Sequence, residues 1–255
     1  MTLSRCSDDV SEELNDLKAI QEKQSHGLTT LEAIKNLSKP HVRSPFIIIV
    51  MNFMLTNFSG CAALIFYAVG IFKQAGIDEN EHLAAIIIAI VRIFGGVLAI
   101  LMVQKLPRRV HAMICSSLMG LSTAVLGLTL YLKSIGEENK TLNILPIISV
   151  TLYMLAYGAG GSPLMFVFVG ELLPPEYKVL SGVIFSLTFL IVFMVTKMFS
   201  VLLVILTPFG TYWLYASFSI MATLFYYFFL PETKGKTLLE IQSVFKKNKI
   251  YVYRK

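Results

Sequence analysis

The hydrophobic positions of this chain gather into long runs that short polar segments separate. Each run has about 20 residues or more, the length with which an α-helix crosses roughly 30 Å of hydrocarbon at about 1.5 Å per residue. The strict alternation of polar and apolar positions that is typical of membrane-spanning strands is absent. The pattern therefore predicts six transmembrane helices, at Phe46–Phe72, Leu83–Val103, Ala112–Leu132, Ile144–Val169, Val179–Leu206 and Phe209–Leu230.

The composition also indicates an integral membrane protein. Of the 255 residues, 55% are hydrophobic and only 15% are charged, against roughly 25% charged in an average soluble protein. A soluble globule of this size has no means of burying so much apolar surface. Cysteine and histidine show no disulfide or metal spacing, and no phosphate loop or nucleophile elbow occurs. We therefore expect an all-α membrane protein with no metal, no cofactor and no enzymatic activity.

Lysine and arginine are concentrated in alternate loops and at both ends of the chain. The opposite loops contain only Lys73, Lys133 and Lys140. The positive-inside rule then places both termini in the cytoplasm, with the plasma membrane as the expected location. The net charge of +6 fits contact with the inner leaflet of the lipid bilayer and not with nucleic acid. The expected organisation is a cytoplasmic segment at 1–45, a six-helix domain at 46–230 and a basic cytoplasmic tail at 231–255.

Two of the predicted helices are interrupted at corresponding positions. The first is broken at Thr56–Gly60 and the fourth at Gly158–Pro163. If the six helices form a 3+3 inverted repeat, the first and fourth helices are counterparts, and matched irregular segments indicate the solute site of a transporter. Taken singly, each break is explained equally well by close helix packing. The pairing favours transport.

Arg92 lies near the middle of the second predicted helix. A central arginine costs roughly 2.5–3.5 kcal/mol to insert, and such residues usually face the bundle interior or a water-filled cavity. Two interpretations stay open: Arg92 contacts a polar solute or a gating partner, or it binds backbone carbonyls freed at a helix break. Lys197 lies nearer the end of its helix, where its side chain can reach the interface.

Several motifs occur in the order found in the sugar-porter branch of the major facilitator superfamily, which the chain resembles. Pro231–Gly235 (PETKG) is similar to its C-terminal signature, and Gly170–Lys178 (GELLPPEYK) and Lys105–Arg109 (KLPRR) are similar to its cytoplasmic motifs. Asn57–Gly76 resembles its seventh helix, and Val195–Phe199 adds to a likeness with insect facilitated trehalose and sugar transporters. The resemblance implies the C-terminal six-helix half of a twelve-helix bundle, in which residues 1–45 correspond to the central loop.

The resemblance implies facilitated transport of a sugar or similar small polar solute by alternating access. The seventh-helix pattern Gln-Gln-x-Ser-Gly-Ile-Asn reads here as Thr56 to Ala62, and an expected asparagine falls at Arg92. A site with fewer amides offers fewer hydrogen bonds to sugar hydroxyls. The residues expected to line the path are Thr56, Asn57, Arg92, Phe166 and Thr188, with Phe66 and Tyr67 as an outer gate.

The charged residues at the cytoplasmic helix ends have two interpretations. Opposite charges on neighbouring helix ends can latch the bundle on its inner side, and breaking them permits rocking between states. They can also be solvated interfacial charges. The resemblance favours a latch formed by Arg108, Arg109, Glu171, Lys178 and Glu232.

One six-helix half cannot enclose an alternating-access path by itself. We therefore expect a partner, which is a second half, another copy of this chain or a full-length relative. The rival hypothesis is a non-transporting membrane protein that assembles with or regulates a full-length transporter. A truncated product or an incomplete gene model is a further alternative.

Overall fold

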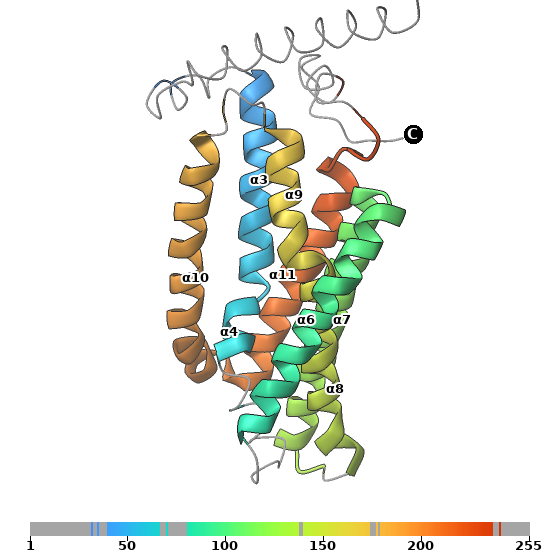
Figure 1. Cartoon of the computed structure of the whole chain (residues 1–255). Helices are drawn as coiled ribbons and strands as arrows, with labels where there is room; N and C mark the ends of the chain where they lie inside the picture. The colour runs from blue at the N-terminus through green and yellow to red at the C-terminus, as the bar shows by residue number, and fades with distance from the viewer. Residues whose placement is uncertain are drawn as a thin grey trace, which may run out of the picture.

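The structure is a computed structural model of the chain. It describes residues 32, 35, 40–66, 70, 81–137, 140–173, 177, 179–236 and 240. Within these ranges every regular element is a helix, and the helices run roughly alongside one another in an elongated bundle (Figure 1). The predicted all-α fold class is confirmed.

The helices follow the hydrophobic runs, and several extend a few residues beyond them. The first helix begins earlier than predicted, at Pro40. Proline is tolerated in the first turn of a helix, so it does not prevent this start. The six predicted helices correspond in order to α3 (Pro40–Phe58) with α4 (Cys61–Phe66), α6 (Glu81–Lys105), α7 (Arg108–Ser134), α8 (Lys140–Ala156) with η2 (Tyr157–Gly161) and α9 (Ser162–Leu172), α10 (Val179–Ile205), and α11 (Thr207–Phe229).

Among the described residues, five stretches are long and apolar enough to cross a membrane. They are Val42–Phe66, Ile86–Lys105, Arg108–Ser134, Leu142–Leu172 and Val179–Ile205. The sixth predicted span, α11, has 23 residues, which is about 35 Å of helix. Its apolar character is diluted by hydroxyl-bearing side chains that are buried in the bundle, among them Thr211, Tyr212, Ser219 and Tyr226.

The helices differ strongly in how much of their surface the bundle covers. α7 and α11 pack along one another, and α3 packs against α9, α10 and α11. α10 stands at one side of the bundle, and α6 packs on η2 and α8 at another (Figure 1). In their most apolar stretches, 67% of residues are buried in α3–α4 but only 17% in α6 and in α10. The latter two helices therefore expose most of their side chains.

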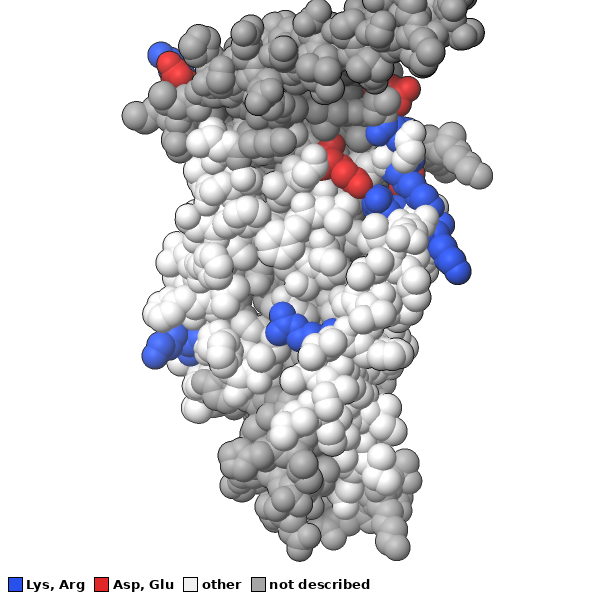
Figure 2. All heavy atoms as spheres, in the orientation of Figure 1, with Lys and Arg blue, Asp and Glu red and all other residues white. Residues whose placement is uncertain are grey.

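Charged side chains are concentrated at one end of the bundle. Figure 2 shows this end in blue and red, next to a long band of mostly white described residues that blue side chains interrupt about half-way along the molecule. The white part of the band has the surface that a bilayer requires, since unpaired charges are costly in hydrocarbon.

Candidate functional site

The first interrupted helix breaks at a glycine that no other residue replaces easily. α3 ends at Phe58, and Ser59 and Gly60 form a turn before α4 begins at Cys61. Gly60 has φ 87°, in the left-handed region that glycine adopts freely. A Cβ at Gly60 would lie 2.3 Å from Cδ2 of Tyr215. Backbone conformation and packing therefore both require glycine at this break.

The second interrupted helix continues through a π-helical turn, Tyr157–Gly161. Such turns leave the regular i→i−4 ladder and are frequent at functional sites. The Ala159 carbonyl in this turn is 2.9 Å from Nε2 of His111, which is fully buried on α7. α6 lies directly against the turn, because a Cβ at Gly95 would be 3.1 Å from the backbone nitrogen of Ala159. The first predicted interruption is confirmed as a break at Ser59–Gly60, and the second is a π-turn through which the helix continues.

The two breaks lie side by side in the bundle. The hydroxyl oxygens of Ser59 and Tyr153 are 2.8 Å apart, and the Tyr153 hydroxyl is also 3.2 Å from the Ser59 carbonyl oxygen. The rings of Tyr153 and Tyr157 stack with centroids 6.5 Å apart. A tyrosine pair on the fourth predicted helix thus connects its own π-turn to the break in the first.

Thr56 and Asn57 lie inside the bundle, with 4% and 3% of their surface exposed. Oγ1 of Thr56 is 3.3 Å from the Tyr226 hydroxyl on α11. Nδ2 of Asn57 donates to the Phe53 carbonyl at 2.7 Å. In this conformation both side chains therefore hydrogen-bond within the six helices.

Phe166 and Thr188 lie nearer the surface, on α9 and α10. Phe166 is 56% exposed. Its ring meets that of Phe53 edge-on at 6.3 Å and lies 5.6 Å from that of Phe185. Thr188 is half-buried and donates to the Ile184 carbonyl of its own helix at 2.8 Å. Phe166 thus presents an aromatic face beside α10.

Arg92 is exposed on α6, with its guanidinium carbon 5.3 Å from the ring centroid of Tyr157. Within the described part of the chain, no carbonyl accepts a hydrogen bond from this guanidinium, so its observed tie to the π-turn is a cation–π contact. Of the two predicted gate residues, Phe66 is exposed at the end of α4, and Tyr67 lies outside the described residues.

The charged end of the bundle contains four of the five residues predicted to form a latch. Nε of Arg108 is 3.1 Å from Oε1 of Glu171. The Glu232 carboxylate accepts hydrogen bonds from the backbone N–H groups of Arg108 at 2.9 Å and Arg109 at 3.2 Å. The Thr233 hydroxyl donates to the other oxygen of Glu171. Lys178 lies outside the described residues.

Glu232 acts through the helix backbone and not through an arginine side chain. The first N–H groups of a helix have no partner within it, and its N-terminus carries partial positive charge. Glu232 follows α11 in the chain and binds the first turn of α7. Arg109 turns away, toward the Tyr227 carbonyl and ring. The segment after α11 thereby joins α7, and Arg108 joins α7 to α9.

Sequence reasoning missed four buried polar residues that hydrogen-bond to one another or to residues around the two interruptions. They are Asn52, Tyr153 and Tyr226, each a polar side chain within a predicted apolar run, and His111, which directly precedes one; this was the available signal. No group of three or more His, Cys, Asp or Glu residues that could hold a metal ion is found in the described part of the chain.

These features define a multi-pass helical membrane protein with paired broken helices and a charged cluster at one end. The chain belongs to the sugar (and other) transporter family, whose model matches residues 2–245. Members of this family are transporters and not enzymes.

Three insect relatives are similar over most of the chain, and all are described as facilitated trehalose transporters. The Drosophila sechellia Tret1-2 homolog is 32% identical over 92% of this chain and 48% of its own length. The Tret1 proteins of Apis mellifera ligustica and Bombyx mori are 29% and 32% identical over 93% and 91% of this chain. The chain spans about half the length of the curated relatives it matches.

Solved structures of a bacterial sugar symporter share the fold. The proton:xylose symporter XylE bound to 6-bromo-6-deoxy-D-glucose matches with a TM-score of 0.68 and 26% identity, over 84% of this chain and 46% of that protein. Inward-open XylE from E. coli matches with a TM-score of 0.67 and 23% identity, over 91% and 46% of the two chains. The resemblance to sugar porters of the major facilitator superfamily is therefore confirmed.

Proposed function

We propose that these helices form one six-helix half of a facilitative transporter that moves a sugar or similar small polar solute by alternating access. The observation that carries the proposal is the contact between the two broken helices through Ser59 and Tyr153. Matched breaks are where transporters of this kind bind their solute. The trehalose transporters among the relatives and the glucose analogue bound to XylE support a sugar as the solute.

A second set of helices completes the path. α6 and α10 expose large apolar side chains, and Arg92 lies in the middle of the exposed face of α6. A lipid-exposed arginine at this depth is costly, whereas a water-lined path or a facing helix lowers that cost. The second half comes from further sequence of the same protein, from another copy of this chain or from a full-length relative.

The solute path uses the side chains in two ways. Phe166 supplies an apolar stacking face, Thr188 a hydroxyl and Arg92 hydrogen-bond donors. In this conformation Thr56 and Asn57 stabilise the broken helix by hydrogen bonds within the bundle. They contact the solute when the break between α3 and α4 opens. Phe66 and Tyr67 close the outer end.

The cluster of Arg108, Glu171 and Glu232 lies on the cytoplasmic side and acts as a latch with Arg109 and Lys178. Its ion pair and backbone hydrogen bonds tie α7, α9 and the segment after α11 together. Both termini are cytoplasmic in this orientation, and the plasma membrane is the proposed location. Cysteines introduced at Glu137 and Lys236, which lie at opposite ends of the bundle, would label from opposite sides of the membrane. Labelling of both from outside would contradict the orientation.

A second candidate function is assembly with a full-length transporter without solute passage through this chain. The observation that favours it is the burial of Thr56 and Asn57, whose polar groups are already hydrogen-bonded within the bundle.

Uptake into liposomes separates the two functions. The purified protein would be sized in mild detergent and reconstituted, and entry of labelled trehalose and glucose measured with the protein alone and with a full-length relative. Saturable entry without an ion gradient is the expected result for the protein in its assembled form. If this protein alone gives no sugar entry but changes the entry that the full-length relative gives, the second candidate is supported. Unchanged entry in every combination would contradict both.

Arg92→Asn tests the solute path within the same assay, with Lys197→Asn as the matched control in an exposed position of α10. A neutral amide at position 92 is expected to change relative uptake of neutral sugars, whereas the control leaves it unchanged. A loss of thermal stability with unchanged sugar preference would show that Arg92 is structural and act against its place in the path.

A further inference from the structure

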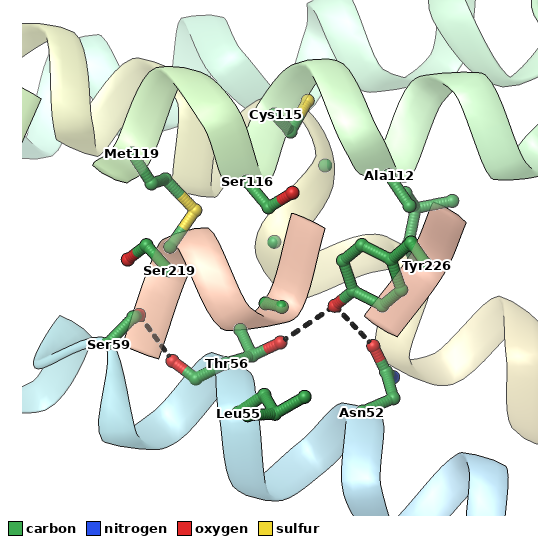
Figure 3. Close-up of a pocket in the computed structure, with 14 residues that line it drawn as sticks. Asn52, Leu55, Thr56, Ser59, Ala112, Cys115, Ser116, Met119, Ser219 and Tyr226 are labelled. Atoms are coloured by element: carbon green, nitrogen blue, oxygen red, sulfur yellow. Dashed lines mark hydrogen bonds between the residues drawn. The ribbon is translucent and has the colours of Figure 1, made fainter. Parts of the chain in front are cut away.

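The cavity between the two interrupted helices is too small for a sugar. Its lining includes Thr56, Asn52 and Tyr226, and it has room for little more than a water molecule. Figure 3 shows its walls, in which the Tyr226 hydroxyl is hydrogen-bonded to Thr56 and to Asn52. In this conformation a sugar therefore has room only outside this cavity, on an exposed face of the bundle.

Arg92 brings a positive charge to such a face, beside the second interruption. It is exposed near the middle of α6, more than about 15 Å from either end of the helix. Its guanidinium lies over the ring of Tyr157 in the π-turn, with the guanidinium carbon 5.3 Å from the ring centroid. Among the described residues no acceptor binds its N–H groups. A guanidinium has five such donors, which are therefore available to a ligand.

The surface of α6 next to Arg92 is open on one side and closed on the other. A Cβ at Gly158 would lie 2.7 Å from the Arg92 carbonyl oxygen, so residue 92 rests directly on the π-turn. Gly96 lies one helical turn from Arg92, and a Cβ at Gly96 would have no heavy atom within 4 Å. A solute can therefore approach the backbone of α6 within reach of the guanidinium.

The described membrane-spanning helices supply no carboxylate near Arg92. Glu171 is the only acidic residue in the five apolar stretches and in α11. It pairs with Arg108 at the charged end of the bundle, about 20 Å along the helix from Tyr157 at about 1.5 Å per residue. Ionisable residues at membrane depth pair with one another or with backbone carbonyls, and Arg92 has neither partner among the described residues. The opposite charge therefore comes from outside these helices.

We propose that the solute supplies this charge, so that the transported sugar carries one carboxylate, as a hexuronate does. The inference rests on the proposed transport function, because Arg92 contacts one of the paired interruptions, where transporters of this kind bind their solute. The guanidinium presents parallel N–H groups that match the two oxygens of a carboxylate. One carboxylate neutralises Arg92, whereas a phosphate monoester, with a charge of about −1.5 to −2 at pH 7, leaves an excess negative charge in the membrane.

Glucuronate and glucose test the proposal, because they differ only in a carboxylate that replaces a hydroxymethyl group. Entry of each labelled sugar would be measured in liposomes that contain the protein in its assembled form. The value of kcat/KM for glucuronate is expected to exceed that for glucose by at least about tenfold. Saturable glucose entry without this preference would overturn the inference and leave the transport function intact. No saturable entry of either sugar would contradict both.

Variants of Arg92 assign the preference to its side chain. Arg92→Asn removes the charge, so the ratio of glucuronate to glucose entry is expected to fall at least about tenfold, and saturable glucose entry in the same variant shows that it folds. Arg92→Lys keeps the charge without the planar fork, so an intermediate ratio is expected. Lys197→Asn, which removes an exposed charge of α10, is the matched control. An unchanged ratio in both Arg92 variants would overturn the inference and assign the opposite charge to a second set of helices.

Discussion

The pair α7 and α11 buries polar groups, whereas the pair α6 and α10 exposes apolar side chains. This is the reverse of the pattern in a soluble protein, which buries apolar side chains. The first pair buries hydroxyl groups, including those of Thr123, Thr129 and Ser219, against its neighbours. The second pair is among the most apolar parts of the chain, yet only 17% of its most apolar residues are buried, and Ile93 and Phe193 are 70% and 59% exposed. Apolarity in this molecule therefore predicts contact with lipid or with further helices, and not a place in the bundle core.

The contrast follows from the solvent. Lipid tails are as apolar as leucine, so helices associate through close packing of small residues and through hydrogen bonds. A Cβ at Gly127 on α7 would lie 2.6 Å from Cδ1 of Trp213 on α11, which shows how closely these helices approach. α6 makes such an approach along its Gly95 side.

The largest predicted effect compares two phenylalanines of α10. Phe199 is 1% exposed and stacks on Tyr215 with ring centroids 6.3 Å apart, whereas Phe193 is 59% exposed. Phe199→Ala is expected to lower the free energy of unfolding by about 3–5 kcal/mol. Phe193→Ala in the isolated six helices is expected to change it by less than about 0.5 kcal/mol. Thermal unfolding in detergent measures both, and equal losses would remove the contrast between the two faces of α10.

Gly60→Ala is expected to be the next most damaging change. Alanine would occupy the left-handed region at a cost of about 1–2 kcal/mol. Its Cβ would also overlap the ring of Tyr215, and overpacking adds about 1–3 kcal/mol. A melting temperature equal to that of the unchanged protein would show that the break does not need glycine.

Two adjacent glycines of α6 give a matched pair. A Cβ at Gly95 would press on the backbone of the π-turn, whereas a Cβ at Gly96 has no heavy atom within 4 Å. Gly95→Ala is expected to cost about 1–3 kcal/mol by separating α6 from η2. Gly96→Ala is expected to cost nothing, because alanine is the better helix former. Unfolding curves of the two variants, recorded side by side, would refute this packing if they coincide.

The smallest predicted effect on stability is at the charged end. The side chains of Arg108 and Glu171 are partly solvated, with 15% and 27% of their surface exposed, so Glu171→Gln is expected to cost about 1 kcal/mol or less. If Arg108 and Glu171 form the proposed latch, Glu171→Gln shifts the transporter toward its inward-open state. Uptake then changes far more than stability does. Unaltered uptake kinetics would assign Arg108 and Glu171 to ordinary interfacial charge.

Sequence patterns were sufficient for the features that depend on local chemistry. Long apolar runs located the helices, and the glycines and proline near Gly60 and Gly158–Pro163 located both breaks. Sequence patterns were insufficient where the hydrogen-bond partner of a side chain depends on which helix lies opposite. Thr56 turns toward Tyr226, 170 residues along the chain, and Glu232 meets backbone N–H groups where an arginine partner was equally plausible. The order of the chain contains no direct signal for such pairings.

The most direct test of the account is photo-cross-linking in the native membrane. Photoreactive residues would be placed at Ile93 on α6 and Phe193 on α10, and for comparison at Ile114 on α7 and Leu224 on α11, all of them exposed. The account predicts adducts from Ile93 and Phe193 with polypeptide other than the six helices that carry the probe, which is further sequence, another copy of this chain or a full-length relative. It predicts adducts with lipid alone from Ile114 and Leu224. Lipid adducts alone from all four positions would contradict a second set of helices against α6 and α10.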